Sequence, residues 1–537
     1  MWTKAFCVLT DAASSQFTRV WGDLRFPSNA KRFRLAPAIW LLSALPLAAQ
    51  APLSAIDWLS QSVRENPVFV APADDVVEGA NTGEIETTTL ADIRKDTVGL
   101  LPATVTGLPK DFWGNSSTKV IADLIAQQKT DSLPAILSLL YTILLAEVDA
   151  PKNDVGNSSL LLARTDKLLD LGALQQAQAL LERAGPTEAA IFRRWFDVSL
   201  LTGHEDHACT AMRASPGFAP TLQSRVFCLA RNGDWNAAAL TLATGETLGY
   251  ITQAEADLMA RFLDPGMYEG EPDLPPPLPL TPLEFIMREA IEQPRPHGAL
   301  PLAFVNADLA PSAAWRNKLE AAERLVRSRA LSANHLIDLY TERQPAASGG
   351  IWNRVRAIQA FDVALLAGDI TGVEQTLPPA YRAMEEVALE VPFAQYYGDR
   401  LGVVALVESE AKSIAFKIGL LSDGFETSAR ASTPTEPQDM FLKGVAIGAL
   451  TGVQPTGVMG KAIADAFLAP TSDGPLFELL KEKKLGEAIL RAMLLLKEES
   501  FADPGDIRTA LTVFRAVGLE EEARRTAIEL LLLDRRG

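Results

Sequence analysis

The sequence predicts an all-α fold built from paired helices. Of its 537 residues, 48% are hydrophobic and only 7% are aromatic, and alanine and leucine supply most of the apolar share. Both are strong helix formers, and neither is β-branched. Runs of Val, Ile, Thr and Tyr that would favour strands are scarce. A repeat centred on glycine further predicts that the helices form hairpins.

The amino-terminal segment is typical of a secretory signal. Residues 31–51, "KRFRLAPAIWLLSALPLAAQA", begin with basic residues at 31–34, continue with the apolar run 35–47 and end in small residues. We therefore expect a leader and signal peptide over 1–49, cleaved near Ala49, and export to a bacterial periplasm. The apolar run is shorter than the ~20 residues of a spanning helix, so we expect no stable membrane span in the mature chain.

Breaks in helical periodicity divide the rest of the chain. Residues 50–110 are rich in Pro, Gly, Thr and acidic residues and predict an extended or partly disordered arm. The segment "DPGMYEGEPDLPPPLPLTP" (264–282) is too dense in proline for a helix and predicts a stiff linker. The predicted helical domains are 111–263 (N-terminal repeat domain), 283–431 (middle) and 432–537 (C-terminal).

Between these breaks the signal is a repeat. "LLDLGALQQAQALL", "SLLTGHEDHACTAM" and "LARNGDWNAAALTL" align on glycines that lie 31 and 30 residues apart, and two later segments fit the same pattern. Ala or Val follows each glycine after five residues, and another apolar residue comes four positions later. Glycine can end a helix in a left-handed turn, and a small residue lets the next helix approach closely. The five repeat glycines are Gly172, Gly203, Gly233, Gly368 and Gly518.

This pattern resembles the helix–turn–helix of tetratricopeptide-type (TPR) repeats, in which a turn glycine precedes a small residue of the second helix by the same interval. The period is nearer 30 than 34, and the aromatic and terminal-proline positions of those repeats are mostly absent. The resemblance implies a TPR-like superhelix of α-α hairpins in two or three units, a fold that binds other proteins on its concave surface.

The net charge disfavours nucleic-acid binding. The formal charge is −17, and residues 1–49 hold six Lys and Arg against two Asp and Glu. The remainder therefore carries 44 Lys and Arg against 65 Asp and Glu, a net of −21. An acidic surface of this size repels phosphate backbones and anionic lipid.

The stretch "HEDHAC" (204–209) holds two of the four histidines and one of the three cysteines. His204 and His207 are candidate zinc or copper ligands, although no second ligand cluster is visible and the adjacent acids suit the first turn of a helix. We expect no cofactor. Both a metal site and a plain helix start remain open.

Cys209 and Cys228 are predicted to form a disulfide. Removal of the signal region discards Cys7 and leaves two cysteines in an oxidising compartment. The turn "SPGFAP" (215–220) lies between them, so an antiparallel helix pair brings both cysteines to a similar level. Two buried free cysteines are the alternative.

The sequence thus predicts a non-enzymatic periplasmic scaffold or adaptor that binds another cell-envelope protein, whose identity it leaves open together with the oligomeric state. The alternative is a cell-wall-active or other periplasmic hydrolase with an unrecognised site. Glu499 and Ser500 resemble the Glu-Ser pair of lytic transglycosylases, although "FADPGDI" replaces the glycine- and glutamine-rich context of that family. A third hypothesis is a metal-handling protein that uses His204 and His207.

Overall fold

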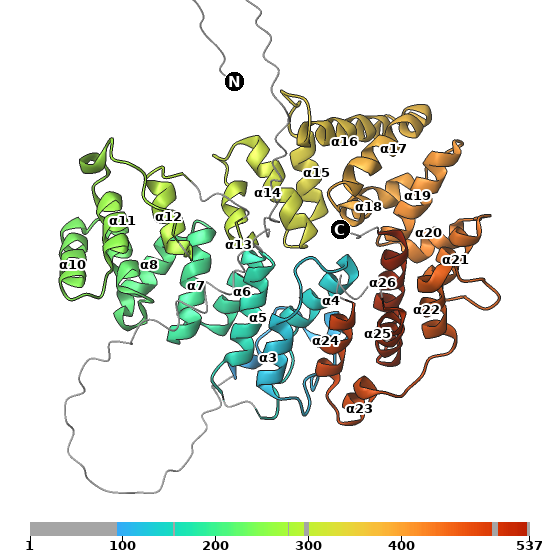
Figure 1. The fold of residues 1–537 in the computed structure, drawn as a ribbon, viewed down its shortest axis with the longest axis horizontal. Helices are drawn as coiled ribbons and strands as arrows, with labels where there is room; N and C mark the ends of the chain where they lie inside the picture. The colour runs from blue at the N-terminus through green and yellow to red at the C-terminus, as the bar shows by residue number, and fades with distance from the viewer. Residues whose placement is uncertain (1–93, 154–155, 278, 295–299, 497–502, 534–537) are drawn as a thin grey trace, which may run out of the picture. The chain divides into compact units, whose positions relative to one another are not determined.

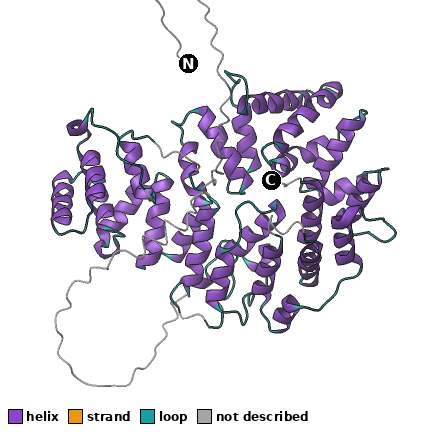
Figure 2. Ribbon diagram, in the orientation of Figure 1, coloured by secondary structure: helices purple, strands orange, loops and turns teal. Residues whose placement is uncertain are grey.

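The described part of the protein is all-α, which confirms the predicted fold class (Figures 1 and 2). The computed structural model describes residues 94–153, 156–277, 279–294, 300–496 and 503–533. Over these ranges there are 25 α-helices and no strand, and one isolated β-bridge pairs Leu101 with Ala146. The predicted signal peptide and most of the predicted arm lie outside the described residues. None of the described helices is both long and apolar enough to cross a membrane.

The helices follow one another through short connections. The first eleven are α2 (Ala103–Thr106), α3 (Thr118–Ala126), α4 (Pro134–Leu145), α5 (Ser159–Asp170), α6 (Leu174–Ala184), α7 (Ala189–Leu201), α8 (Glu205–Ala214), α9 (Leu222–Arg231), α10 (Trp235–Thr247), α11 (Gln253–Leu263) and α12 (Pro282–Ala290). The next eight are α13 (Leu302–Val305), α14 (Trp315–Arg327), α15 (Ala333–Thr341), α16 (Ile351–Leu366), α17 (Ile370–Glu385), α18 (Glu390–Leu401), α19 (Ser409–Leu421) and α20 (Phe425–Ala431). The last six are α21 (Pro437–Ala446), α22 (Gly457–Leu468), α23 (Pro475–Lys481), α24 (Leu485–Leu495), α25 (Pro504–Ala516) and α26 (Glu520–Leu532). Short 3-10 helices are η1 (Lys95–Thr97), η2 (Pro216–Phe218), η3 (Pro265–Tyr268) and η4 (Asn306–Leu309).

Each repeat glycine lies between two helices that pack against each other. The pairs are α5–α6, α7–α8, α9–α10, α16–α17 and α25–α26. All five glycines have a positive φ, between 68° and 90°, the left-handed conformation that costs a residue with a side chain about 1–2 kcal/mol. The turns therefore reverse the chain between consecutive helices and produce helical hairpins.

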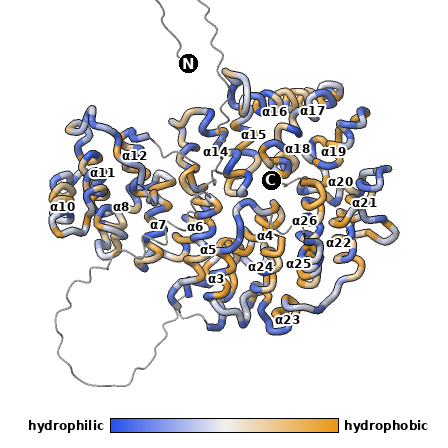
Figure 3. Tube along the Cα trace, in the orientation of Figure 1, coloured by the Kyte–Doolittle hydropathy of each residue, from blue (hydrophilic) through white to orange (hydrophobic). Residues whose placement is uncertain are grey.

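Small residues lie where the two helices of a hairpin meet. Ala177, Ala208 and Ala238 are each five residues after their turn glycine, and all three are completely buried. The apolar residues four positions later, Leu181 and Met212 among them, are also buried. Each second helix thus presents a continuous apolar stripe to its partner, and apolar and polar stretches alternate along the helices in Figure 3.

The end of the predicted arm belongs to the packed body. From residue 94 onward the chain lies against α4 and α5, where the fully buried guanidinium of Arg164 donates to the carbonyls of Leu144 (2.7 Å), Val98 (2.8 Å) and Ala146 (3.0 Å). Burial lowers the pKa of Arg164 to about 10, and the nearby Asp96 carboxylate opposes that shift. Arg164 therefore ties residues 96–98 to the helices through backbone atoms alone.

The proline-rich segment 264–282 connects two helices that pack together. Helix α12, which follows it, contacts both α11 and α7. Within the segment, Pro272 and Pro275 accept hydrogen bonds from Arg261 and Arg288 (both 2.8 Å), and the Leu274 amide donates to Gln293 (2.8 Å). The segment thus lies against the helices on either side of it. The domain boundaries proposed from the sequence remain predictions.

Helices from the two ends of the described chain also meet. Helix α3 packs on α24, and α4 packs on α26 (Figure 1). The buried Trp113 ring lies so close to Gly486 that a Cβ there would be 2.5 Å from it. The Ala135 amide, in the first turn of α4, donates to the Glu529 carboxylate of α26 at 2.9 Å. These contacts join segments more than 350 residues apart.

A matched pair of glycine substitutions tests the turn geometry. Gly172 and Gly203 share a positive φ, but an added Cβ at Gly172 would lie 2.7 Å from Leu325 and 3.0 Å from Leu302, whereas nothing lies within 4 Å of Gly203. We expect Gly203→Ala to lower the free energy of unfolding by about 1 kcal/mol. Gly172→Ala should lower it by about 1–3 kcal/mol more, because overpacking adds to the backbone strain. Chemical denaturation measures both values, and equal losses would contradict the close approach of α13 and α14 to the α5–α6 turn.

Candidate functional site

The two cysteines singled out by the sequence are joined in the structure. Cys209 of α8 and Cys228 of α9 form a disulfide, with Cα atoms 5.0 Å apart and sulfur atoms 1.93 Å apart. Both side chains are buried in the contact between the two helices. A bridge across a loop of this length contributes about 3 kcal/mol in the chain-entropy model. The bond therefore fixes the α8–α9 hairpin.

The two histidines beside Cys209 are exposed. His204 is the N-cap residue of α8, and its Nδ1 lies 3.0 Å from the Thr202 hydroxyl. The acids between the histidines are ion-paired: Arg231 lies 3.1 Å from Glu205 and 2.7 Å from Asp206. The structure brings no third metal-binding side chain to His204 and His207, and no group of three or more His, Cys, Asp or Glu among the described residues could hold a metal ion. Glu499 and Ser500 lie outside the described residues.

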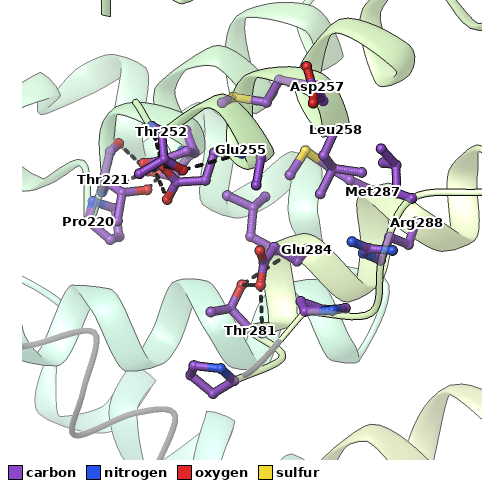
Figure 4. Close-up of a pocket in the computed structure, with 18 of the residues that line it drawn as sticks. Pro220, Thr221, Thr252, Glu255, Asp257, Leu258, Thr281, Glu284, Met287 and Arg288 are labelled. Atoms are coloured by element: carbon purple, nitrogen blue, oxygen red, sulfur yellow. Dashed lines mark hydrogen bonds between the residues drawn. The ribbon is translucent and has the colours of Figure 1, made fainter. Parts of the chain in front are cut away.

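A cavity of about 870 Å³ lies close to this hairpin, between α7, α9, α11, α12 and the proline-rich segment (Figure 4). This volume falls in the range of ligand pockets, about 300–1,000 Å³. Its lining combines apolar side chains such as Phe196, Leu258 and Met287 with charged and hydroxyl groups from several elements. Ligand sites characteristically combine an apolar lining with a few convergent polar groups.

Three helices begin at this cavity, and each begins with a capping box. Thr252 caps α11: its amide and hydroxyl both donate to the Glu255 carboxylate at 2.7 Å. Thr281 caps α12 in the same way, with both groups 3.1 Å from Glu284. At the start of α9, Thr221 exchanges hydrogen bonds with Ser224 instead. Figure 4 shows these helix starts around the cavity.

The capping carboxylates also connect the helices. Gln223 of α9 donates to Glu255 of α11 at 2.7 Å, so one carboxylate satisfies a helix start and a neighbouring helix together. Burial raises the pKa of Glu284, and the Glu255 charge adds to that shift, whereas the Thr281 hydrogen bonds oppose it. Glu284 is thus a partly desolvated acid that lines the same cavity as Glu255.

Helix α7 contributes a buried acid to the lining. Asp197 is 7% exposed, and its Oδ2 lies 4.0 Å from Nε of Arg193. Burial raises the pKa of Asp197 to about 6, and the guanidinium groups of Arg193 and Arg194 reduce that shift. Arg194 is itself held by Asp166 of α5, at 2.6 and 2.8 Å. The carboxyl group thus stays protonated to a higher pH than an exposed aspartate does, and it is mainly ionised at neutral pH.

Prolines form one wall of the cavity. Pro275, Pro276, Pro277 and Pro279 line it, and Pro275 and Pro276 are also exposed. The Arg288 side chain of α12 holds this wall through its hydrogen bond to the Pro275 carbonyl. A segment that the sequence predicts as a linker therefore contributes directly to the candidate site.

Nothing in the sequence alone predicts this site, although a local signal for each helix start exists. Capping boxes have the form Ser or Thr, two residues, then Glu or Gln. Thr252–Glu255 and Thr281–Glu284 match that form, and Thr221–Ser224 is a variant of it. The motif marks where each helix starts, but it does not show that three starts meet.

Comparison with known proteins suggests no function for this chain, so the function proposed below rests on the geometry of the site. No protein-family model matches the sequence. No significant match was found among curated proteins or among solved structures.

The buried acid predicts a specific pH dependence. Because the pKa of Asp197 is about 6 in the folded protein and about 3.8 without the fold, the folded state binds more protons between these values. Stability from this residue is therefore complete below pH 4 and is lost as the pH rises through 6, a change of up to about 3 kcal/mol.

The measurement is the free energy of unfolding of the wild type minus that of Asp197→Asn, taken at several pH values from 4 to 7.5. The subtraction removes the titration of other groups. We expect the difference to increase toward low pH in favour of the wild type. A difference that does not change with pH would contradict a raised pKa at Asp197.

Proposed function

We propose that this protein is an exported adaptor of the bacterial cell envelope that binds a segment of another envelope protein in the cavity between α7 and α12. The observation that carries the proposal is the cavity itself, about 870 Å³ in volume and lined by residues from four helices, α7, α9, α11 and α12. Arrays of helical hairpins present extended surfaces whose side chains come from several repeats, a geometry suited to peptide recognition.

The hairpins support the finer part of the proposal, a TPR-like array. Left-handed glycines 30 or 31 residues apart separate the helices of α5–α6, α7–α8 and α9–α10. Buried alanines recur at the same position of each second helix. This spacing and packing are those expected of a repeat, in which every hairpin is stabilised by its neighbours.

Export is supported by the sequence and by the cysteines. Residues 31–51 have the order of a secretory signal. The disulfide between Cys209 and Cys228 fits an oxidising compartment such as the periplasm. Together they support a partner that also resides in the cell envelope.

Site-specific photo-crosslinking tests the proposal. A photoreactive amino acid replaces Tyr250, which is 55% exposed and lines the cavity, or Val458 of α22, which is 71% exposed and does not line it. In cells of the native host, we expect a single crosslinked partner from position 250 in the periplasmic fraction, and none from position 458, because the partner binds in the cavity.

Identical products from both positions would show non-specific contact, and the absence of any product from position 250 would contradict partner binding at this site. A product confined to the cytosolic fraction would contradict export.

A further inference from the structure

We propose that the segment bound in the α7–α12 cavity is basic, with lysine or arginine side chains that enter the cavity. This inference rests on the proposed function and specifies the chemistry of the partner. It follows from the balance of hydrogen-bond donors and acceptors in the lining, from its charge, and from the apolar surface beneath the charged groups.

Donors at the helix starts are already engaged. The amides of Thr252 and Thr281 and their hydroxyls donate to the capping glutamates, and the Thr221 amide donates to Ser224. The amides of Glu255 and Glu284 in turn donate to the threonine hydroxyls. An anionic ligand that relied on these groups would have to displace the capping side chains, which stabilise their helices.

The proline wall supplies acceptors. Proline has a carbonyl group but no backbone N–H, so the four lining prolines cannot donate a hydrogen bond from the main chain. Their carbonyl groups can accept, as Pro275 does from Arg288. A ligand that faces this wall forms hydrogen bonds with it only by donating, as an ammonium or guanidinium group does.

Charge favours the same ligand. Four acids and two arginines line the cavity, a formal excess of two negative charges; they are Asp197, Glu255, Asp257, Glu284, Arg193 and Arg288. Arg193 is paired with Asp197, and Arg288 donates to Pro275, although Nε of Arg288 has no hydrogen-bond partner among the described residues. The adjoining residues 264–273, "DPGMYEGEPD", add four acids and no basic residue. The partial positive charge at three helix starts reduces this excess but does not reverse it.

A buried acceptor lies within this lining. The Oδ2 atom of Asp197 receives no hydrogen bond from any described residue and has only Nε of Arg193 at 4.0 Å, and an unmade hydrogen bond at a buried polar atom carries a free-energy cost. A cationic side chain near this carboxylate would offset that cost. Beneath the charged groups, Leu258, Leu283 and Met287 provide an apolar surface. Lysine and arginine pack their aliphatic stems on such surfaces while the charged end reaches a polar group.

Fluorescence anisotropy on the full-length chain tests this inference with three labelled octapeptides, in which leucine alternates with lysine, glutamate or glutamine. We expect the lysine peptide to bind at least tenfold more tightly than the glutamate peptide, and its affinity to fall as salt is raised because ionic contacts are screened.

The matched variants are Glu255→Gln with Glu284→Gln, and Glu246→Gln on the exposed face of α10 as control. Glutamine retains the capping box, so the double variant removes charge from the cavity while the helix starts remain. We expect the double variant to bind the lysine peptide roughly fivefold more weakly. The control should bind it as the wild type does.

Equal binding of the three peptides, or loss of affinity in the Glu246→Gln control as large as in the double variant, would overturn the inference. Salt dependence provides a second measurement if the double variant is unstable: an affinity for the lysine peptide that is insensitive to salt would also overturn it. A crosslinked partner from position 250 whose bound segment is acidic would leave the proposed function standing and refute the basic ligand alone.

Discussion

The left-handed turn between consecutive helices is the constraint on which the rest of the structure depends. A glycine with positive φ reverses the chain after α5, α7 and α9, so alternate helices run in the same direction. Helices α9 and α11 therefore begin at the same end of the array, where α12 also begins. A reversal of another kind, made by the turn 215–220 without any residue of positive φ, brings Cys209 beside Cys228. The cavity and the disulfide are both consequences of how hairpins stack.

If the hairpins only stacked, each would be stabilised by its neighbours alone. Contacts between distant segments of the chain add further stability. Trp113 packs on Gly486, Ala135 in the first turn of α4 donates to Glu529 of α26, and Asn306 donates to the Gly172 carbonyl at 2.9 Å. In each of these contacts a side chain meets a backbone group. The contact therefore fixes where the backbone lies, in addition to requiring a particular side chain. These contacts thus hold Trp113, α4 and the α5–α6 turn against segments from later in the chain.

The sequence predicts local features well and long-range ones poorly, for physical reasons. The all-α class and the Cys209–Cys228 disulfide follow from helix propensity and from spacing across one turn, and both are confirmed. The contact of Trp113 with Gly486 has no local signal, since nothing near either residue encodes the other. Proline density in 264–282 shows that this segment is not helical, but not that its prolines line a cavity. Asp197 lies on α7, and nothing in the local sequence shows that α12 packs against this helix or that Asp197 lines a cavity.

Hydrogen–deuterium exchange of the full chain, with and without the lysine–leucine octapeptide, tests the central claim most directly. If the cavity binds a basic segment, amides near residues 221–225, 252–256 and 281–285 should exchange more slowly with peptide, because these three helix starts line the cavity. Amides of α22 to α24 should be unaffected. Protection elsewhere in the chain, or an unchanged exchange rate at all three helix starts under saturating peptide, would contradict the claim.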